Sequence, residues 1–233
     1  MNDQRSNDLN RFYSLLAELE RKLGGPRLLS QCSDSLDWPE RGVYFFREAG
    51  ENRGDSEHAQ RIVRVGTHAL KSRASTTLWN RLSGHKGVPD TGGGNHRASI
   101  LRMFVGQALC ERDGHDYPSW GEGSSAPLEV RQGELPLERL VSTRIGNMPL
   151  LWLAVDDKPG PDSLRGYIER NAIALLSNYG KHRIDPPSES WLGNYCLRER
   201  VRHSGLWNPS HVTETYDPAF LGDLEHLIDQ VNR

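Results

Sequence analysis

The sequences GVYFFR at residues 42–47 and RIVRVGT at residues 61–67 decide how the chain folds. Both are rich in β-branched and aromatic residues, so they predict two β-strands. The polar segment between them, residues 48–60, predicts a loop because it is too long for a tight turn. Tyr44 and Arg64 then lie inside strands that otherwise suit a buried sheet, where polar side chains are unexpected.

The spacing of apolar residues elsewhere predicts several helices and one further strand. Leu9, Phe12 and Leu16 recur at helical spacing, and Asp8 can cap the helix that they form. This helix packs on the main domain or, alternatively, supplies a dimer contact. The other predicted helices are residues 75–83, 98–109, 164–176 and the acidic amphipathic segment 220–231, and the predicted strand is the apolar run 148–155. Residues 111–147 are polar and rich in turn formers, which indicates an inserted region over the surface.

Length, cysteine content and hydropathy limit the class of protein to which the chain can belong. At 233 residues the chain is long enough for one large domain, or for a small domain with additions. Its three cysteines, Cys32, Cys110 and Cys196, form no Cys-x-x-Cys pair, so neither a disulfide framework nor a structural zinc site is expected. No window approaches the roughly 20 apolar residues of a membrane span, and the first residues lack an apolar signal core. We therefore expect a soluble cytoplasmic protein with no membrane partner.

Charge is unevenly distributed along the chain. The net charge is −2, but residues 61–102 carry eight Lys or Arg residues against one acid, Asp90, which makes this segment +7 and the remainder −9. A basic surface of this kind is an expected footprint of polyanion binding. A solvated charged face is the alternative, and charge alone does not decide between the two.

Three polar residues beyond the first two strands stand where chemistry is expected. Arg81 and His85 are four residues apart across a helix end, so both can face one site, although Gly84 leaves the helical placement of His85 open. Glu169 lies in an apolar neighbourhood, with Ile173 four residues further along the predicted helix. A carboxylate flanked in this way lies at the edge of the core or is held there for a purpose.

Taken in order, GVY, RVG, the Arg81-x-x-x-His85 pair, Glu169 and Asn178 resemble the signature of GIY-YIG nucleases. Each short element alone is weak, and it is their order and spacing together that carry the resemblance. The resemblance implies an α/β (α+β) fold in which helices flank a small central antiparallel sheet. The implied organisation is an N-terminal helical extension over residues 1–40, a catalytic domain over residues 41–180 with an insertion at about 86–147, and a C-terminal helical extension over residues 181–233.

The resemblance also implies a role for each residue in metal-dependent hydrolysis of DNA phosphodiester bonds. Tyr44 would act at the attacking water as general base or proton relay, and nearby positive charge is needed because an ordinary tyrosine has a pKa of about 10. Arg81 would contact the scissile phosphate, which suits its planar fork of donors. Glu169 would hold Mg²⁺ or Mn²⁺, which takes its other ligands from water and phosphate. His85 would assist proton transfer or bind phosphate, and Asn178 would fix the site by hydrogen bonding.

Arg64 departs from the family pattern, because RVG has an arginine where YIG has a tyrosine. If the two strands pair with Tyr44 and Arg64 on one face, the guanidinium would favour the ionised tyrosine. The register cannot be read from the sequence, so this role is a hypothesis. Basic residues near the predicted site are expected to contact nucleic acid as well: Lys71, Arg73, Lys86, His96 and Arg97.

Two alternatives to a nuclease remain open at this point. A GIY-YIG-like domain that has lost cleavage would serve as a nucleic-acid-binding module, and the missing second tyrosine supports that reading. An interaction protein without enzymatic activity is favoured only if the basic segment proves dispersed in three dimensions. The lone carboxylate of Glu169 beside a predicted phosphate site favours cleavage, because a pure binder has no need of it. A homodimer would suit cleavage of both strands, and the oligomeric state stays open.

Overall fold

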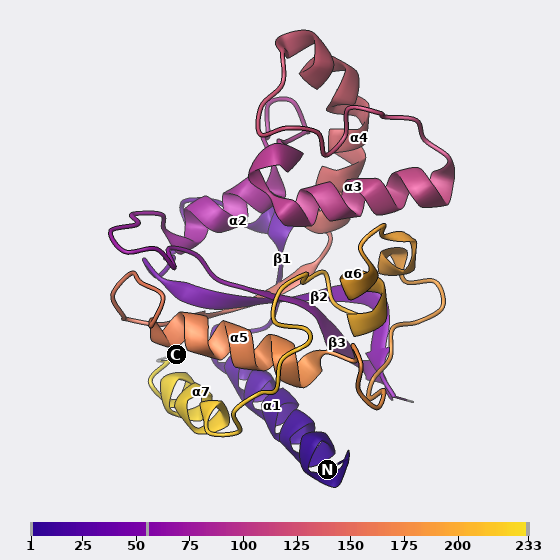
Figure 1. Ribbon diagram of the computed structural model, residues 1–233. Coiled ribbons are helices and arrows are strands. Elements are labelled where there is room, and N and C mark those ends of the chain that lie inside the picture. Colours follow the sequence, from indigo (N-terminus) through magenta and orange to yellow (C-terminus); the bar gives the residue numbers. More distant parts are fainter. Residues whose placement is uncertain (1, 55, 232–233) are drawn as a thin grey trace.

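The computed structural model describes residues 2–54 and 56–231 and is built around a four-stranded antiparallel sheet (Figure 1). The strands are β1 (Arg27–Leu28), β2 (Gly42–Arg53), β3 (Ser56–Gly66) and β4 (Pro149–Ala154), in the spatial order β1-β4-β2-β3. Every neighbouring pair runs antiparallel. The expected small antiparallel sheet is confirmed, and β2, which carries Tyr44, lies between β3 and β4.

Helices cover both faces of the sheet. They are α1 (Asn2–Leu23), α2 (Leu78–Lys86), α3 (Ile100–Asp113), α4 (Leu128–Gly146), α5 (Leu164–Leu176), α6 (Glu199–Ser204) and α7 (Phe220–Asp229), with short 3₁₀ turns η1 (Leu29–Gln31), η2 (His96–Ala98) and η3 (Leu192–Tyr195). Figure 1 shows α2, α3 and α4 on one side of the sheet and α1, α5 and α7 on the other. The expected α+β class is therefore confirmed.

The face covered by α1, α5 and α7 is apolar. Val43 and Phe45 of β2 point to this face and join Ile168 of α5 in one buried cluster. Phe12 of α1 meets Phe45 edge-on, with 6.0 Å between ring centroids, and lies 6.3 Å from the ring of Phe220 in α7. The apolar stripe of α1 is thus used inside the fold, which excludes the alternative that it supplies a dimer contact.

The opposite face of the sheet carries Tyr44 and Phe46, because successive side chains of a strand alternate between faces. Leu78 and Leu82 of α2 and Phe104 of α3 pack on these two rings in a second buried cluster. This second core also encloses polar and charged side chains, among them those of His85 and Arg102.

Regular pairing of β2 with β3 sets the position of Arg64, and a β-bulge in β3 follows directly after it. Tyr44 lies opposite Gly66 and Phe46 lies opposite Arg64, but the next residue of β2 pairs with Ile62, so Val63 is an extra residue in the ladder. Arg64 therefore shares a face with Phe46 and Tyr44. The strand pairing that the sequence left open puts Tyr44 and Arg64 on one side of the sheet.

The predicted loop at residues 48–60 is wrong, because β2 and β3 continue through most of it as a long hairpin. Its polar side chains have partners that the sequence could not reveal. Glu51 is buried and accepts hydrogen bonds from Arg61 Nε at 2.8 Å and from the hydroxyl of Ser188 at 2.5 Å. Because Ser188 belongs to the C-terminal part of the chain, polarity here marks a tertiary contact and not a solvated loop.

The inserted region is more regular than its composition indicated. Helix α4 takes up 19 residues of it, and buried ion pairs join this helix to the segment around α3. Arg97 contacts Glu134 at 2.6 Å, and Arg102 pairs with Glu138. The polar residues that suggested an irregular surface segment are therefore the ones that hold the insertion together.

The C-terminal part of the chain folds back onto the sheet. The indole N–H groups of Trp191 and Trp207 both donate to Glu48 Oε2, at 3.0 and 3.2 Å, and Arg144 of α4 pairs with the other oxygen of the same carboxylate. Glu48 lies in β2 and is buried. One strand carboxylate therefore joins the insertion and the C-terminal segment.

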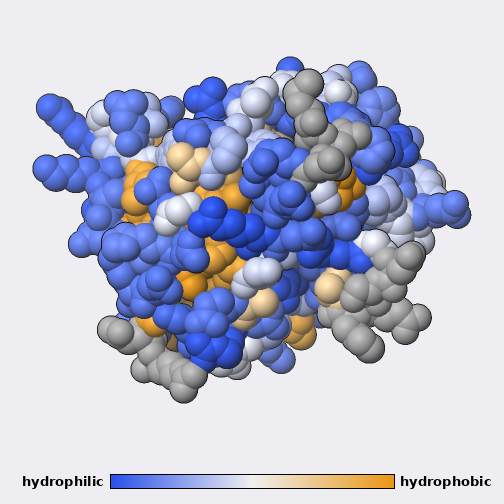
Figure 2. Space-filling view, turned by 90° about the horizontal axis from the view of Figure 1, so that it is seen from below, coloured by the Kyte–Doolittle hydropathy of each residue, from blue (hydrophilic) through white to orange (hydrophobic). Residues whose placement is uncertain are grey.

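The outer surface is mostly hydrophilic. Viewed from the side of α1 and α7, hydrophobic residues show in several recessed patches between hydrophilic ones (Figure 2). Among residues 2–54 and 56–231, no helix is both long and apolar enough to cross a membrane.

Candidate active site

Tyr44 is fully buried in β2, and its ring lies over Gly66 of β3. A Cβ atom added at Gly66 would overlap the Cζ and hydroxyl oxygen atoms of Tyr44. The glycine of RVG is therefore required by the tyrosine of GVY, because only a residue without a side chain leaves room for the ring. The two sequence elements form one structural unit.

His85 comes from the last turn of α2, so the helix does continue through Gly84. Thr77 caps this helix in a reciprocal capping box with Asn80, two residues after the predicted helix start. The Nε2 atom of His85 lies 2.8 Å from the hydroxyl oxygen of Tyr44. Burial holds the pKa of His85 well below its ordinary value, and the positive charges of three arginines act in the same direction: Arg81, Arg64 and Arg102. The imidazole is thus neutral at neutral pH.

Two arginines place positive charge at this site. Arg64 is buried, donates from Nη1 to the backbone oxygen of Trp207 at 2.7 Å, and leaves its Nε without a partner among the described residues. Arg81 of α2 likewise has a buried Nε that no described group accepts. Buried donors without partners are rare in folded proteins and, at a site, favour an anionic ligand.

Glu169 reaches the same region from α5, on the far side of the sheet. Its Oε1 accepts the backbone N–H of Thr67 at 3.1 Å, directly after the end of β3. Burial raises the pKa of Glu169, while the charges of Arg64, His211 and Arg81 and the bond from Thr67 partly offset that rise. Because Arg64 and Arg81 act on both His85 and Glu169, the two halves of the site share one electrostatic environment.

The donor set around Glu169 fits a hard divalent cation held by few protein ligands. Oε2 of Glu169 has no hydrogen-bond partner in the described part of the chain, so it is free to coordinate. No group of three or more His, Cys, Asp or Glu side chains gathers anywhere in residues 2–54 and 56–231. A single carboxylate suits Mg²⁺ or Mn²⁺, which keeps several waters and binds substrate phosphate, but does not suit a structural zinc site.

Asn178 lies apart from this site. Its Nδ2 donates to the backbone oxygen of Ile184 at 3.1 Å, and its Oδ1 accepts from the Ile184 N–H at 3.0 Å and from Arg5 at 3.3 Å. The amide is used to hold its own loop, so the structure gives no support to the expected role. Asn208 stabilises the site's edge instead, because it exchanges two hydrogen bonds with the backbone of Val65 in β3.

The expected basic surface over residues 61–102 is only partly present. Its members Arg61, Arg64, Arg97 and Arg102 point inward, where they are engaged by acidic side chains or backbone oxygens. Acids elsewhere in the chain neutralise Arg61, Arg97 and Arg102: Glu51, Glu134 and Glu138. Charge counted along a segment therefore overstated the charge that reaches the surface.

Three of the five expected nucleic-acid contacts are already used within the protein. His96 donates from Nδ1 to Glu138 at 2.9 Å and accepts at Nε2 from the N–H of Gly121 at 3.1 Å, so neither nitrogen is free. Arg97 is bidentate to Glu134, and Lys86 donates to the backbone oxygen of Cys32 at 2.6 Å. The remaining two, Lys71 and Arg73, are exposed in the loop between β3 and α2.

Three polar residues near the candidate site were not among the site residues predicted from the sequence. His68 follows β3, donates from Nδ1 to the carbonyl of Thr76 at 2.7 Å, and keeps a buried Nε2 without a described partner. His211 contacts Glu214 at 2.8 Å and has a left-handed backbone with φ of 63°. Ser99 lies 2.7 Å from His85 Nδ1. The proximity of His68 to Gly66 in sequence was a usable signal, whereas the other two are brought in by the insertion and the C-terminal segment.

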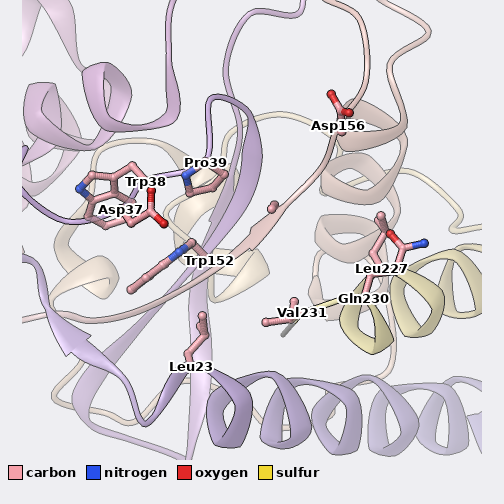
Figure 3. Close-up of a pocket in the computed structure, with 10 residues that line it drawn as sticks. Leu23, Asp37, Trp38, Pro39, Trp152, Asp156, Leu227, Gln230 and Val231 are labelled. Carbon is pink, nitrogen blue, oxygen red and sulfur yellow. The ribbon is translucent and has the colours of Figure 1, made fainter. Parts of the chain in front are cut away.

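A separate hollow of about 410 Å³ lies between the ends of α1 and α7 and strand β4 (Figure 3). Trp38 and Trp152 line it, with 4.7 Å between their ring centroids, and Asp37 and Asp156 give it acidic walls. None of the residues described above lines this hollow. Its negative charge disfavours phosphate, so it is not part of the candidate active site.

Comparison with known proteins gives one match. A family model described as a GIY-YIG domain matches residues 3–233, so it includes the terminal helices as well as the core that the sequence motifs mark. Neither the curated proteins nor the solved structures gave a significant match. The matched family is generally one of endonucleases. The chain therefore belongs to the GIY-YIG family.

Proposed function

We propose that this protein is a metal-dependent endonuclease that hydrolyses phosphodiester bonds in DNA. The observation that carries the proposal is the convergence of Tyr44 and His85 on one face of the sheet with Glu169 from the other. The charges of Arg64 and Arg81 act on both sides of this arrangement. Arg64 and Arg81 each keep a buried Nε without an acceptor among the described residues, and Glu169 keeps one oxygen without a described hydrogen bond.

Tyr44 is the proposed group that takes a proton from the attacking water. Its hydroxyl oxygen contacts neutral His85 at 2.8 Å, and Arg64 lies on the same face of the sheet. A general base must accept a proton, and in this proposal the hydroxyl oxygen of Tyr44 is the acceptor. Because Tyr44 is fully buried, this chemistry requires that substrate binding admit water to its hydroxyl.

Arg81 and Arg64 are the proposed partners of the scissile phosphate. Each carries a buried Nε–H without a described acceptor, and phosphate oxygens would satisfy such donors. Lys71 and Arg73 stand exposed in the neighbouring loop, where they would contact the flanking DNA backbone.

Glu169 is the proposed metal-binding residue, through its free Oε2. A bound Mg²⁺ or Mn²⁺ would stabilise the charge that develops on phosphate and on the leaving oxygen. The hydrogen bond from Thr67 to Oε1 fixes the orientation of the carboxylate. Asn178 has no part in this proposal.

A binding module that has lost cleavage is the second candidate, and Arg64 is the observation that favours it. Arg64 replaces the second tyrosine of the signature and is tied to the backbone of Trp207. A module of this kind would bind DNA with Arg81 and the exposed loop cations but would leave the strands intact.

The test is cleavage of plasmid, linear duplex, branched and single-stranded DNA in Mg²⁺ or Mn²⁺, with chelated metal as the blank. We expect metal-dependent cutting of at least one substrate, and loss of cutting in Glu169→Gln. Glu225→Gln is the matched control, because Glu225 is exposed in α7 and forms a surface ion pair with Arg11. Binding without cutting on every substrate favours the module, and equal cutting by Glu169→Gln contradicts the proposed role of this carboxylate.

A further inference from the structure

An open edge of the sheet borders the hollow between α1, α7 and β4 (Figure 3). β1 pairs with β4 only at Pro149 and Leu150, and no other described strand lies on that side of β4. Trp152 and Ala154 belong to the part of β4 that β1 leaves unpaired, and both line the hollow. Because Ala154 is exposed, this strand edge is accessible from outside.

The backbone groups of Trp152 and Ala154 point to the open side of β4. The N–H of Val155 donates to the backbone oxygen of Arg41 at 3.1 Å, toward β2, and backbone groups alternate between the two sides of a strand. The backbone oxygen of Met148 accepts a hydrogen bond on the β1 side, which fits the same alternation. In the described part of the chain, nothing bonds to the backbone N–H or C=O of Trp152 and Ala154. The edge therefore keeps unpaired backbone donors and acceptors.

The N-terminal segment leaves these groups uncovered. If β1 continued in the same register, Gly25 would lie opposite Trp152, but the N–H of Gly25 donates to the backbone oxygen of Glu20 at 2.9 Å, at the end of α1. An open strand edge of this kind is a template for pairing with another chain. A short solvated edge is the alternative, and the side chains around the hollow distinguish the two.

Three tryptophans gather beside the edge. The ring of Trp152 lies 4.7 Å from that of Trp38, and Trp38 stacks on Trp79 with 5.3 Å between ring centroids. All three side chains are half-buried. Among aromatic rings, the indole face attracts cations most strongly. This wall of the hollow therefore suits the guanidinium or ammonium group of a basic side chain.

The charges around the hollow favour the same kind of ligand. Asp37 and Asp156 line opposite sides of it, and both are exposed (Figure 3). Neither carboxylate forms an ion pair with any residue that the structure describes. None of the described residues that line the hollow is Lys or Arg. The hollow therefore attracts cations and repels phosphate.

The same charges argue against a second copy of this chain. Two β4 edges brought together would place Asp37 and Asp156 of one copy near those of the other, and like charges oppose such pairing. A DNA strand is disfavoured in the same way. The chemistry that fits both the open edge and the acidic hollow is that of an extended polypeptide with positive charge.

The opposite wall of the hollow predicts the order of side chains in that polypeptide. Leu23, Leu227 and Val231 line this wall, where they are half-buried and pack against the apolar core. Side chains of an added strand alternate between faces, so those opposite Trp152 and Ala154 would meet the indoles and the carboxylates. The side chains between them would meet the apolar wall. A segment in which basic and apolar residues alternate fits both walls.

We propose that the open edge of β4 is a docking site for a partner protein, which adds an extended segment of alternating basic and apolar residues as a further antiparallel strand. The backbone of this segment would pair with Trp152 and Ala154, and its basic side chains would lie among the tryptophans and the two aspartates. The inference does not rest on the proposed nuclease function, because the residues that line the hollow are not those of the candidate active site.

The probe is the synthetic peptide acetyl-TVRVRVT-amide, which carries two arginines on one face, and isothermal titration calorimetry measures its binding. We expect saturable binding of this peptide. The peptide acetyl-TVEVEVT-amide should bind at least about tenfold more weakly, because like charges then meet. N-methylation of both arginine backbone nitrogens keeps the charge but removes the donors that would reach β4, so binding should be lost.

Measurements on the protein locate the bound peptide. The amide signals of Trp152 and Ala154 should shift most in ¹H–¹⁵N correlation spectra, because their N–H groups gain acceptors. Asp37→Asn and Asp156→Asn should each weaken binding about two- to fivefold. Asp90→Asn is the control, because Asp90 is exposed in a loop and does not line the hollow. Ala154→Pro removes an N–H at an edge position where proline is tolerated, and should abolish binding.

Equal binding of the peptide and its N-methylated form would show that the hollow takes cations without strand pairing, and would overturn the proposal. Equal affinity for acetyl-TVEVEVT-amide, unchanged affinity in a protein with both aspartates replaced, or no binding of acetyl-TVRVRVT-amide would do the same. Sedimentation that shows a dimer of the unmodified protein and a monomer of Ala154→Pro would assign the edge to a second copy and contradict the proposed partner. A protein that cuts DNA but does not bind the peptide would contradict this inference alone.

Discussion

The two faces of the sheet are built from alternate residues of one strand, yet they enclose different chemistry. The face covered by α1, α5 and α7 takes Phe45 into a core of apolar side chains. The face covered by α2, α3 and α4 takes Tyr44 and encloses with it the fully buried His85 and Arg102. Phe45 packs in the apolar core, whereas the neighbouring residue Tyr44 points to the face that carries the polar side chains.

The difference shows where the protein tolerates unfavourable burial. A buried polar group destabilises a fold unless it is hydrogen-bonded. On the second face Arg102 is bonded to Glu138, to Ser142 and to the backbone of His85, which compensates its burial. Arg64 and Arg81 each keep an Nε that has no acceptor within residues 2–54 and 56–231. These two donors without acceptors lower the stability of the fold. The phosphate of the proposed substrate would accept hydrogen bonds from them.

The largest difference in stability and cleavage rate is expected between substitutions at two adjacent residues, Phe45 and Tyr44. Phe45→Ala leaves a cavity in the apolar core and should lower the free energy of unfolding by about 3–5 kcal/mol. Tyr44→Phe keeps the ring and should cost only about 1–3 kcal/mol, but should slow cleavage about 10²–10⁴-fold. Chemical denaturation and single-turnover kinetics at a temperature where both variants are folded make the comparison. A Tyr44→Phe protein that cuts at the parent rate would contradict the claim that Tyr44 takes part in cleavage.

Gly66→Ala should lower both the free energy of unfolding and the cleavage rate. The added methyl group must displace the ring of Tyr44, because it would overlap the Cζ and hydroxyl oxygen atoms. Overpacking of this kind costs about 1–3 kcal/mol, and the displaced hydroxyl should lower the cleavage rate toward that of Tyr44→Phe. Near-parent stability and rate would show that the contact between the two signature elements is not needed.

His85 should leave a signature in the pH dependence of stability. Its folded pKa lies well below its ordinary value, so the unfolded chain binds the extra proton first as the pH falls. Stability should decline below about pH 6.5, with a contribution of up to about 1.4 kcal/mol per pH unit from this one group. His85→Gln should show a shallower slope between about pH 5 and 6.5 in urea denaturation. Parallel slopes would mean that the buried ring is not held neutral.

The smallest effect is expected from Gly84→Ala, the control for Gly66→Ala. Gly84 is exposed within α2, and nothing lies within 4 Å of a Cβ atom built there. Alanine should stabilise the helix by about 0.5–1 kcal/mol and leave cleavage unchanged. A loss of activity in this variant would show that α2 must flex between Arg81 and His85.

Local patterns predicted much of the fold. The β-branched and aromatic run at 42–47 formed β2, and the apolar run at 148–155 formed β4, because strand composition and burial agree there. The helix predicted at residues 164–176 coincides with α5. The hairpin arms were missed since Glu51 is paired by residues distant in sequence, which no local pattern records.

The site was predicted in part for the same reason. Tyr44, Arg81, His85 and Glu169 could be found from ordered motifs, because the family signature is written in sequence order. The face that Arg64 takes depends on the register between β2 and β3, which the sequence of one strand does not specify. Asn178 has a local role in its own loop, which a motif cannot distinguish from a role in the site.

The most direct test of the central claim is single-turnover cleavage of one pre-bound duplex over a range of Mg²⁺ concentrations, with Glu169→Gln beside the unmodified protein. Cleavage that saturates with Mg²⁺ in the unmodified protein, and is absent in a Glu169→Gln protein that binds the duplex equally well, is the predicted result. Equal rates in the two proteins, or cleavage that persists in chelator, would contradict a metal-dependent site at Glu169.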